Sequence, residues 1–220
     1  QSTANLDETL SKARASLAEG GRKKAVRLLE PFAGQLETSG DLAALFAEAC
    51  LAVGRVEDAK KALSSVPESW GGWQRAVLEA QVLTANGQAK DAAAILEPLS
   101  EAERERTSIW RALAEAQAAL NDWPEALFAA KRWSSLAPTS GEPFRLIADI
   151  HRATGNVEQA DSAYRAAMDA EYGGQEFLMD YAEFLLEQKR FDEARNCLKS
   201  TIPETRWQQE RLQNLLLFAG

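Results

Sequence analysis

An alanine recurs about every 34 residues along this chain, and no other sequence feature constrains the fold as strongly. The steps between successive positions are 34, 33, 34, 34 and 34 residues, at Ala25, Ala59, Ala92, Ala126, Ala160 and Ala194. A second column lies twelve residues earlier in every repeat, at Ala13, Ala47, Ala80, Ala114, Ala148 and Ala182. A fixed period in this range indicates stacked structural repeats, each of which buries its apolar face against a neighbour.

The residue five positions before each alanine of the first column predicts a tight turn. It is glycine in four repeats, Asn121 in the fourth and Lys189 in the sixth. Glycine and asparagine tolerate the left-handed backbone conformation that ends many helices. Two small-residue columns on either side of such a turn predict a helical hairpin whose helices approach closely. The third repeat arrives one residue early, after Pro67 to Trp73, and predicts a local irregularity there.

Composition favours an all-helical fold in one continuous domain. The chain has 220 residues, of which 45% are hydrophobic, and β-branched residues are scarce. No segment alternates apolar and polar residues as a half-buried strand does. No Pro/Ser/Gly-rich stretch is long enough to separate two domains.

The fourth repeat carries a recognisable family pattern. It holds Trp110, Leu113, Ala114, Asn121, Trp123, Ala126 and Pro138. The segment from Ala153 to Ala170 is a second good match. The pattern resembles the tetratricopeptide repeat (TPR) family over roughly residues 6–206. The resemblance implies an all-α, right-handed superhelical solenoid of about six hairpins plus a C-terminal helix, in one domain spanning 1–220. The repeats are expected near 6–39, 40–72, 73–106, 107–140, 141–174 and 175–206, with the final helix at 207–218.

Charge narrows the classes of partner. The net charge is −8, which disfavours nucleic acids and anionic membranes because both bind basic surfaces. No apolar run is long enough to cross a membrane, so we expect no direct membrane insertion. Two cysteines in distant repeats, Cys50 and Cys197, are expected to be unpaired, which favours the cytoplasm. The chain begins at Gln1 rather than methionine, so a periplasmic location stays open.

The sequence contains no constellation of residues that would support catalysis. Its single histidine, His151, occupies a column that elsewhere packs between helices. Metal sites require several His or Cys ligands at short spacing, and nucleotide sites require glycine-rich phosphate loops; neither pattern is present. We therefore expect no catalytic residue, no cofactor and no metal, and we interpret the chain as a protein that is not an enzyme.

The resemblance to TPR proteins implies that the first helix of each pair lines a concave groove that holds a protein or peptide segment. Positions carried over from the family predict these partner-binding residues: Glu48, Val77, Gln81, Arg111, Glu115, Arg145, Asp149, Arg152, Met179 and Glu183. The arginines allow two interpretations. They pair locally with acidic residues four positions away, or Arg145 and Arg152 together bind a carboxylate of the partner.

Two further features bear on binding. Trp70 and Trp73 either pack into the irregular third connection or anchor a partner. The first repeat has Leu10 and Arg14 where chaperone-tail receptors of the family carry lysine and asparagine, so we expect no binding of chaperone C-terminal peptides.

The last helix carries more apolar residues than it needs to cover the final repeat. Leu217 and Phe218 follow a helical pattern of leucines. We expect either that the natural protein continues or that this end docks on another subunit, with self-association through the C-terminal helix as one form. The leading hypothesis is a protein–protein interaction scaffold. The alternative is the repeat portion of a larger bacterial-type protein, an assembly arm in envelope or polysaccharide export or an arm beside an enzyme domain.

Overall fold

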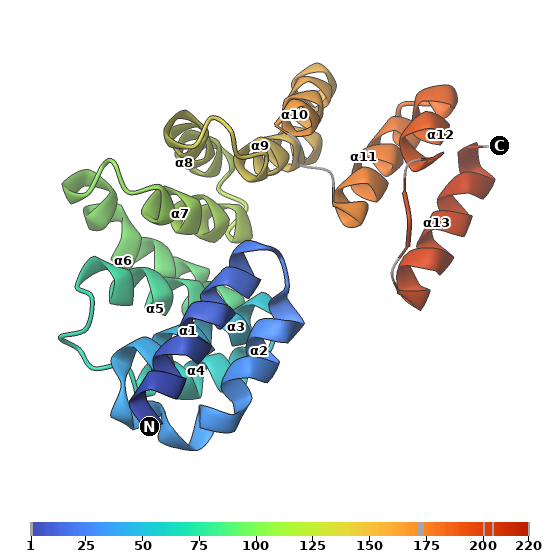
Figure 1. Cartoon of the computed structure of the whole chain (residues 1–220). Coiled ribbons are helices and arrows are strands. Elements are labelled where there is room, and N and C mark those ends of the chain that lie inside the picture. The colour runs from blue at the N-terminus through green and yellow to red at the C-terminus, as the bar shows by residue number, and fades with distance from the viewer. Residues whose placement is uncertain (1, 171–173, 200, 204, 220) are drawn as a thin grey trace. The chain divides into compact units, whose positions relative to one another are not determined.

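The computed structural model describes residues 2–170, 174–199, 201–203 and 205–219, and every regular element in these residues is a helix. The predicted all-α solenoid of helical hairpins is confirmed (Figure 1). Helical hairpins pair α1 (Ser2–Ala18) with α2 (Arg22–Leu29), α3 (Gly40–Ala52) with α4 (Val56–Ser64), α5 (Trp73–Ala85) with α6 (Ala89–Ala102), α9 (Glu142–Ala153) with α10 (Val157–Asp169), and α11 (Gln175–Glu187) with α12 (Phe191–Lys199). Between α6 and α9 in the chain come α7 (Thr107–Ala119) and α8 (Trp123–Leu136). The last helix, α13, spans Arg206–Ala219.

The chain divides into two compact units, Gln1–Ala126 and Leu127–Gly220, called here the first and second unit. In the first unit the helices that open successive repeats pack side by side, α1 against α3, α3 against α5, and α5 against α7. In the second unit α9 packs against α10, while α11, α12 and α13 pack against one another. The prediction that residues 1–220 form a single domain stays a prediction.

The two alanine columns are the closest-packed positions of the hairpins. All twelve of these alanine side chains are fully buried, with no exposed surface. A methyl group at these positions lets paired helices approach, while larger side chains such as Leu29, Leu96 and Tyr164 fill the space beside them. The periodicity that was visible in the sequence is therefore the periodicity of helix contact.

All six predicted turn residues adopt the left-handed conformation. Their φ angles lie between 59° and 80°, in the order Gly20, Gly54, Gly87, Asn121, Gly155 and Lys189. In each turn the next backbone N–H donates to the carbonyl five residues back, as from Asn156 to His151 at 2.8 Å. This pattern is the Schellman motif, which satisfies carbonyls at a helix end. Lys189 adopts the same conformation as its glycine counterparts despite its side chain.

Two connections depart from the regular hairpin. After Leu29 the chain tightens into the 3₁₀ segment η1 (Glu30–Thr38), which the sequence analysis did not predict. Pro31 stands at its start, and proline both removes a backbone donor and clashes with the preceding turn of an α-helix. The predicted irregularity before the third repeat contains Gly71 and Gly72, whose φ angles are 63° and 55°.

Candidate functional site

The first unit contains a surface hollow of about 620 Å³. It is formed by α3, α5 and α7, the opening helices of three successive repeats, with α5 packed between the other two. Its lining residues are Glu48, Leu51, Ala52, Trp73, Gln74, Val77, Leu78, Gln81, Thr84, Ala85, Ser108, Arg111, Ala112 and Glu115.

The middle of the hollow is uncharged. Leu51, Val77 and Leu78 supply apolar surface, and Gln81 and Thr84 on α5 supply neutral polar groups. An amide side chain offers both a donor and an acceptor to a bound main chain. This mixture suits a protein segment that buries one or two apolar side chains and hydrogen-bonds through its backbone.

Charge is confined to the two edges of the hollow. On the α7 edge, the Nε of Arg111 donates to Oε1 of Glu115 at 3.0 Å, as the local interpretation of this pair predicted. On the α3 edge, Glu48 makes no hydrogen bond or ion pair with any described residue. Surrounding protein raises the pKa of the Glu48 carboxyl above its ordinary value, and the charge of Arg14 acts in the opposite direction.

The two tryptophans of the irregular connection have different surroundings. The indole N–H of Trp70 donates to Asp41 at 2.8 Å, and its ring covers Gly40, where an added Cβ would meet Cδ1 of Trp70 at 2.6 Å. Trp70 therefore packs into the connection. Trp73 lines the hollow, and the guanidinium carbon of Arg106 lies 5.2 Å from its ring centroid. Trp73 thus presents an aromatic edge to the site.

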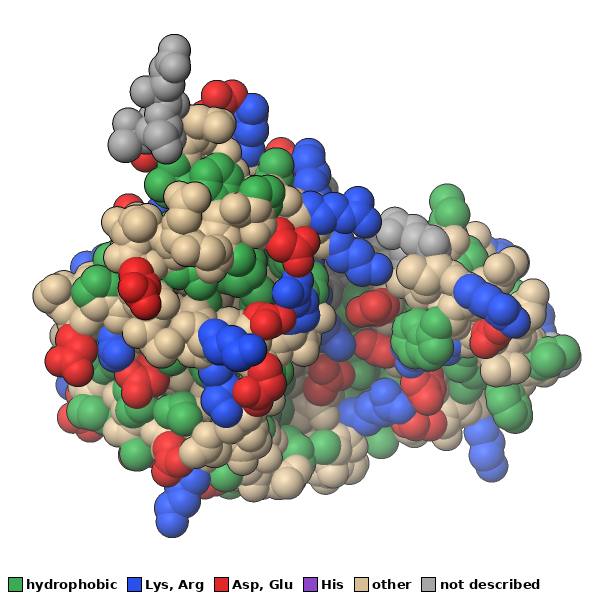
Figure 2. Space-filling view, turned by 90° about the horizontal axis from the view of Figure 1, so that it is seen from below, with side chains coloured by type: hydrophobic (Ala, Val, Ile, Leu, Met, Phe, Trp, Pro, Cys, Tyr) green, Lys and Arg blue, Asp and Glu red, His purple; other side chains and the backbone are tan. Residues whose placement is uncertain are grey.

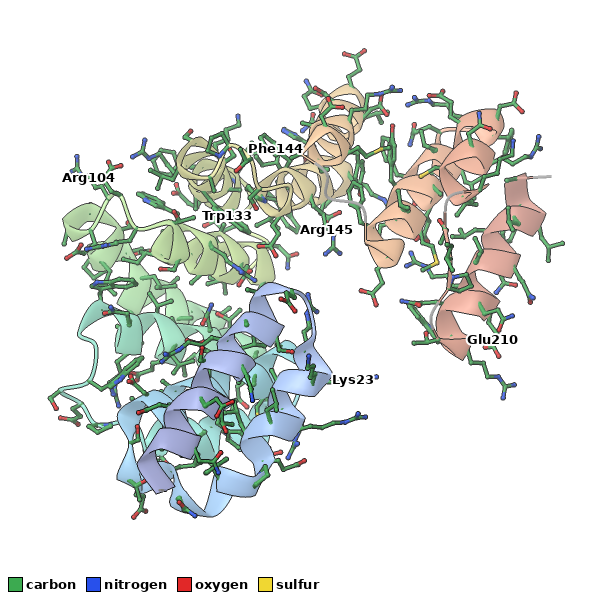
Figure 3. The ribbon with its side chains drawn as sticks, viewed as in Figure 1. Lys23, Arg104, Trp133, Phe144, Arg145 and Glu210 are labelled. Carbon is green, nitrogen blue, oxygen red and sulfur yellow. The ribbon has the colours of Figure 1, made fainter. Side chains whose placement is uncertain are left out.

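In the second unit the predicted arginines bind carboxylates of the next repeat. Arg145 extends from α9 (Figure 3), and its Nη2 lies 3.1 Å from Oδ2 of Asp180 on α11. Arg152 donates two hydrogen bonds to the carboxylate of Glu187, which also lies on α11. The predicted local partner of Arg145, Asp149, is farther away at 3.8 Å. Neither of the two interpretations drawn from the sequence anticipated these pairs between repeats.

The remaining second-unit residues of the predicted groove contact other residues of the protein or are buried. Asp149 accepts a hydrogen bond from the hydroxyl of Tyr164 at 2.9 Å. Burial raises the pKa of the Asp149 carboxyl, while the charge of Arg145 opposes that rise. Glu183 accepts from Arg211 of α13 at 2.7 Å. Met179 is fully buried, so its side chain is in the core rather than on a binding surface.

The structure therefore separates the ten predicted residues into three groups. Five line the hollow of the first unit, four belong to the charged face of the second unit, and Met179 lies in the core. One signal in the sequence could have revealed the charged face. Each of Arg145 and Arg152 is followed 35 residues later, about one repeat, by an acidic residue. A shared groove formed by all of the exposed residues stays a prediction.

His151, Cys50 and Cys197 are the residues that the sequence analysis interpreted as structural rather than catalytic. His151 borders a second hollow together with Lys131 and Phe144, and burial followed by the charge of Lys131 lowers its pKa. Burial raises the pKa of the Cys50 thiol and of the Cys197 thiol to about 11. Such thiols are poor nucleophiles because little thiolate exists at neutral pH.

Within the residues that the structure describes, no group of three or more His, Cys, Asp or Glu side chains is arranged to hold a metal ion. No helix in the described part of the chain combines the length and the apolar character that crossing a bilayer requires.

Comparison with known proteins gives consistent matches to one family. Two family models described as tetratricopeptide repeat match residues 77–140 and 151–216. A thermophilic TPR protein in Thermus thermophilus is 18% identical, with a TM-score of 0.72 over 81% of this chain and 100% of that chain. A tetratricopeptide repeat protein from Parabacteroides merdae ATCC 43184 is 12% identical, with a TM-score of 0.70 over 96% and 82% of the two chains.

A third similar structure is MamA from Desulfovibrio magneticus RS-1, which is 15% identical with a TM-score of 0.52 over 76% of this chain and 96% of that chain. At these identities the structural matches show a shared fold and nothing further. A search of curated proteins found no match to the sequence.

Proposed function

Because this chain belongs to the tetratricopeptide repeat family, we propose that it is a non-catalytic scaffold that holds a segment of a partner protein in the hollow of its first unit. Repeats of this family serve in general as protein–protein interaction scaffolds, and stacked repeats create extended binding surfaces. The single observation that carries the more specific proposal is the hollow between α3, α5 and α7. Three successive repeats contribute to it, and its middle is uncharged.

The dimensions and chemistry of the hollow favour a protein segment over a small ligand. A hollow of about 620 Å³ accommodates a few residues of an extended chain or one face of a helix. Leu51 and Val77 provide an apolar floor, Gln74 and Gln81 can bond to a backbone, and Trp73 supplies an aromatic edge. Aromatic side chains at such positions contribute strongly to protein recognition.

Site-specific photo-crosslinking tests this proposal. A photoreactive amino acid placed at Gln74, within the hollow, should capture a protein partner from native lysate. The same amino acid at Ser64, an exposed residue of α4 outside the hollow, should not capture it. Adding Gln81→Trp, which fills the hollow without changing charge, should abolish capture at position 74.

Equal capture at positions 64 and 74, or capture that survives Gln81→Trp in a correctly folded variant, would place the partner elsewhere and contradict the proposal. Circular dichroism melting curves of each variant verify that the fold is retained.

A second candidate function is supported by exposed apolar residues at α13. Leu217 and Phe218 are 79% and 74% exposed, and Figure 2 shows hydrophobic side chains at the end of the molecule that holds α12 and α13. Under this alternative the chain is an assembly arm whose α13 docks on another subunit. Light scattering of the wild type and of Leu217→Glu tests it. Loss of a dimer or larger assembly in the variant supports the alternative, and a wild type that is monomeric at high concentration contradicts self-association.

A further inference from the structure

The charges around the hollow of the first unit are unbalanced. Arg111 and Glu115 on the α7 edge neutralise each other through their 3.0 Å ion pair. Glu48 on the α3 edge has no such partner among the described residues. Glu48 therefore leaves the hollow with one carboxylate that no cation compensates by direct contact.

The Glu48 side chain is exposed, so a partner can reach its carboxylate at the edge of the hollow. The protein around it raises the pKa of this carboxyl through desolvation. A carboxylate beside a protein-lined hollow gains more from a cationic hydrogen-bond donor than one surrounded by water, because the local dielectric is lower. Arg14 on α1 is near enough to act on this pKa, but it forms no hydrogen bond or ion pair with Glu48.

The position of Glu48 relative to the floor adds a geometric requirement. Glu48 and Leu51 are three residues apart on α3, so they lie on the same face of that helix. Val77 and Gln81 on α5 line the adjacent part of the hollow. A bound segment that places a cationic side chain at Glu48 would therefore place a neighbouring apolar side chain against Leu51 and Val77.

We propose that the first-unit hollow selects protein segments that carry a lysine or arginine close to an apolar residue, with Glu48 receiving the cation. The inference rests on the proposed function, since it names the partner chemistry of the same hollow. The overall charge of the chain is consistent with it: at −8 the protein attracts basic segments over long distances. An acidic or phosphorylated segment would instead meet the uncompensated carboxylate and be repelled.

A peptide array identifies the preferred chemistry. Each member is an extended peptide of leucine, alanine and serine in which one position at a time is lysine, glutamine or glutamate. We expect retention of members with lysine beside leucine, and no retention of the corresponding glutamate members. The best lysine peptide is then labelled with fluorescein, and its affinity is measured by anisotropy with the full chain.

Three variants locate the interaction of this labelled peptide. Glu48→Gln should weaken binding about tenfold, the loss expected for one charge-assisted hydrogen bond. Arg14→Gln should strengthen binding, because it removes a competing positive charge. Glu68→Gln, which removes an exposed carboxylate from the loop between α4 and α5, is the matched control and should leave affinity unchanged. The advantage of lysine over glutamine should also shrink at high salt.

The outcomes distinguish the inference from the function on which it rests. If no array member binds, or if Gln81→Trp leaves the lysine peptide bound, the hollow does not hold peptide segments and the proposed function is wrong. If Gln81→Trp abolishes binding but lysine, glutamine and glutamate peptides bind equally, the proposed function stands and the inference is wrong. Equal losses for Glu48→Gln and Glu68→Gln would also overturn the inference, because the preference would then reflect net charge alone.

Discussion

The first unit leaves the face of its opening helices as a hollow with an uncharged middle, whereas the second unit joins the corresponding helices by arginine–carboxylate pairs. The alanine columns make the positions comparable. Val77 lies three residues before its buried alanine, and Arg145 does so in the second unit; Thr84 and Arg152 likewise occupy one repeat position. The second unit combines these two arginines with acidic residues on the next opening helix, and together they pair successive repeats where the first unit leaves an open surface.

The units also differ in the kind of side chain that packs between successive repeats. The second unit uses aromatic contacts, with Tyr164 and Tyr181 stacked at a centroid distance of 5.1 Å and Phe184 at 5.2 Å from Tyr164. The first unit uses aliphatic side chains such as Leu42, Leu78 and Val82. The comparison teaches that the repeat period fixes the helix contacts, while the residues between the alanines decide whether a surface serves a partner or the fold.

The largest expected effect comes from the aromatic cluster. Phe184→Ala should lower the free energy of unfolding by about 3–5 kcal/mol, because the side chain is fully buried and leaves a cavity. Val82 occupies the same repeat position in the first unit, and Val82→Ala should cost about 2 kcal/mol. Urea unfolding followed by circular dichroism measures both. A smaller loss for Phe184→Ala than for Val82→Ala would show that the aromatic cluster does not stabilise the second unit as described.

The next largest effect comes from comparing an ion pair between repeats with an exposed ion pair within one helix. Asp180 accepts hydrogen bonds from both Arg145 and Arg211, at 3.1 and 2.8 Å, and its side chain is only 20% exposed. Asp180→Asn should therefore cost roughly 1–3 kcal/mol. Lys12→Gln, which removes the exposed ion pair between Lys12 and Glu8 within α1, should leave the stability almost unchanged. Thermal melts of the two variants compare them, and equal losses would mean that the pairs between repeats are no stronger than a surface pair.

The turns test whether the repeats are equivalent. Lys189→Gly should stabilise the protein by about 0.5–1 kcal/mol, because Lys189 has a positive φ that glycine adopts without steric cost. Gly155→Ala places a side chain at the same turn position of the preceding repeat and should destabilise by a similar amount. Chemical denaturation gives both values. A loss of stability in Lys189→Gly would indicate that the lysine side chain contributes more than its backbone strain costs.

The smallest expected change in stability comes from two carboxylates whose pKa values are shifted in opposite directions. Their variants should therefore change stability in opposite directions. The raised pKa of Glu48 means that ionisation is less favourable in the folded chain. The resulting destabilisation is absent below the ordinary glutamate pKa of about 4.3 and develops as pH rises through the folded pKa. Glu48→Gln should thus stabilise the protein slightly at pH 7, and this gain should vanish in acid.

Asp161 supplies the opposite case in the second unit. Burial acts to raise its pKa, but hydrogen bonds from Arg190, Arg165 and Tyr181 outweigh burial, and the pKa is lowered. Its stabilising contribution is complete above the ordinary aspartate pKa of about 3.9 and is lost as pH falls through the folded value. Asp161→Asn should therefore destabilise at pH 7 and lose its effect in acid. Melting temperatures of both variants from pH 3 to 7 check the signs, and parallel pH profiles would contradict the assignment.

The sequence by itself determined the helical hairpins of this protein and the positions where their helices touch. The twelve alanines and six turn residues are local signals: a methyl group permits close approach, and a left-handed turn ends a helix. Even Lys189 follows the pattern, because repeat packing outweighs the preference of one residue. The 3₁₀ segment after Leu29 was missed because Pro31 permits several ways of ending a helix, and its neighbours select one.

Only the tertiary structure decided which residues of the opening helices remain available to a partner. Spacing along one helix suggested that Arg145 would pair with Asp149, but its shorter contact is with Asp180, which lies one repeat onward. The positions carried over from the TPR family assigned Met179 to the groove, and the structure buries it. Contacts between repeats depend on the relative orientation of two helices from successive repeats. A period of 34 residues does not specify that orientation. The hollow beside Glu48 is open for the same reason.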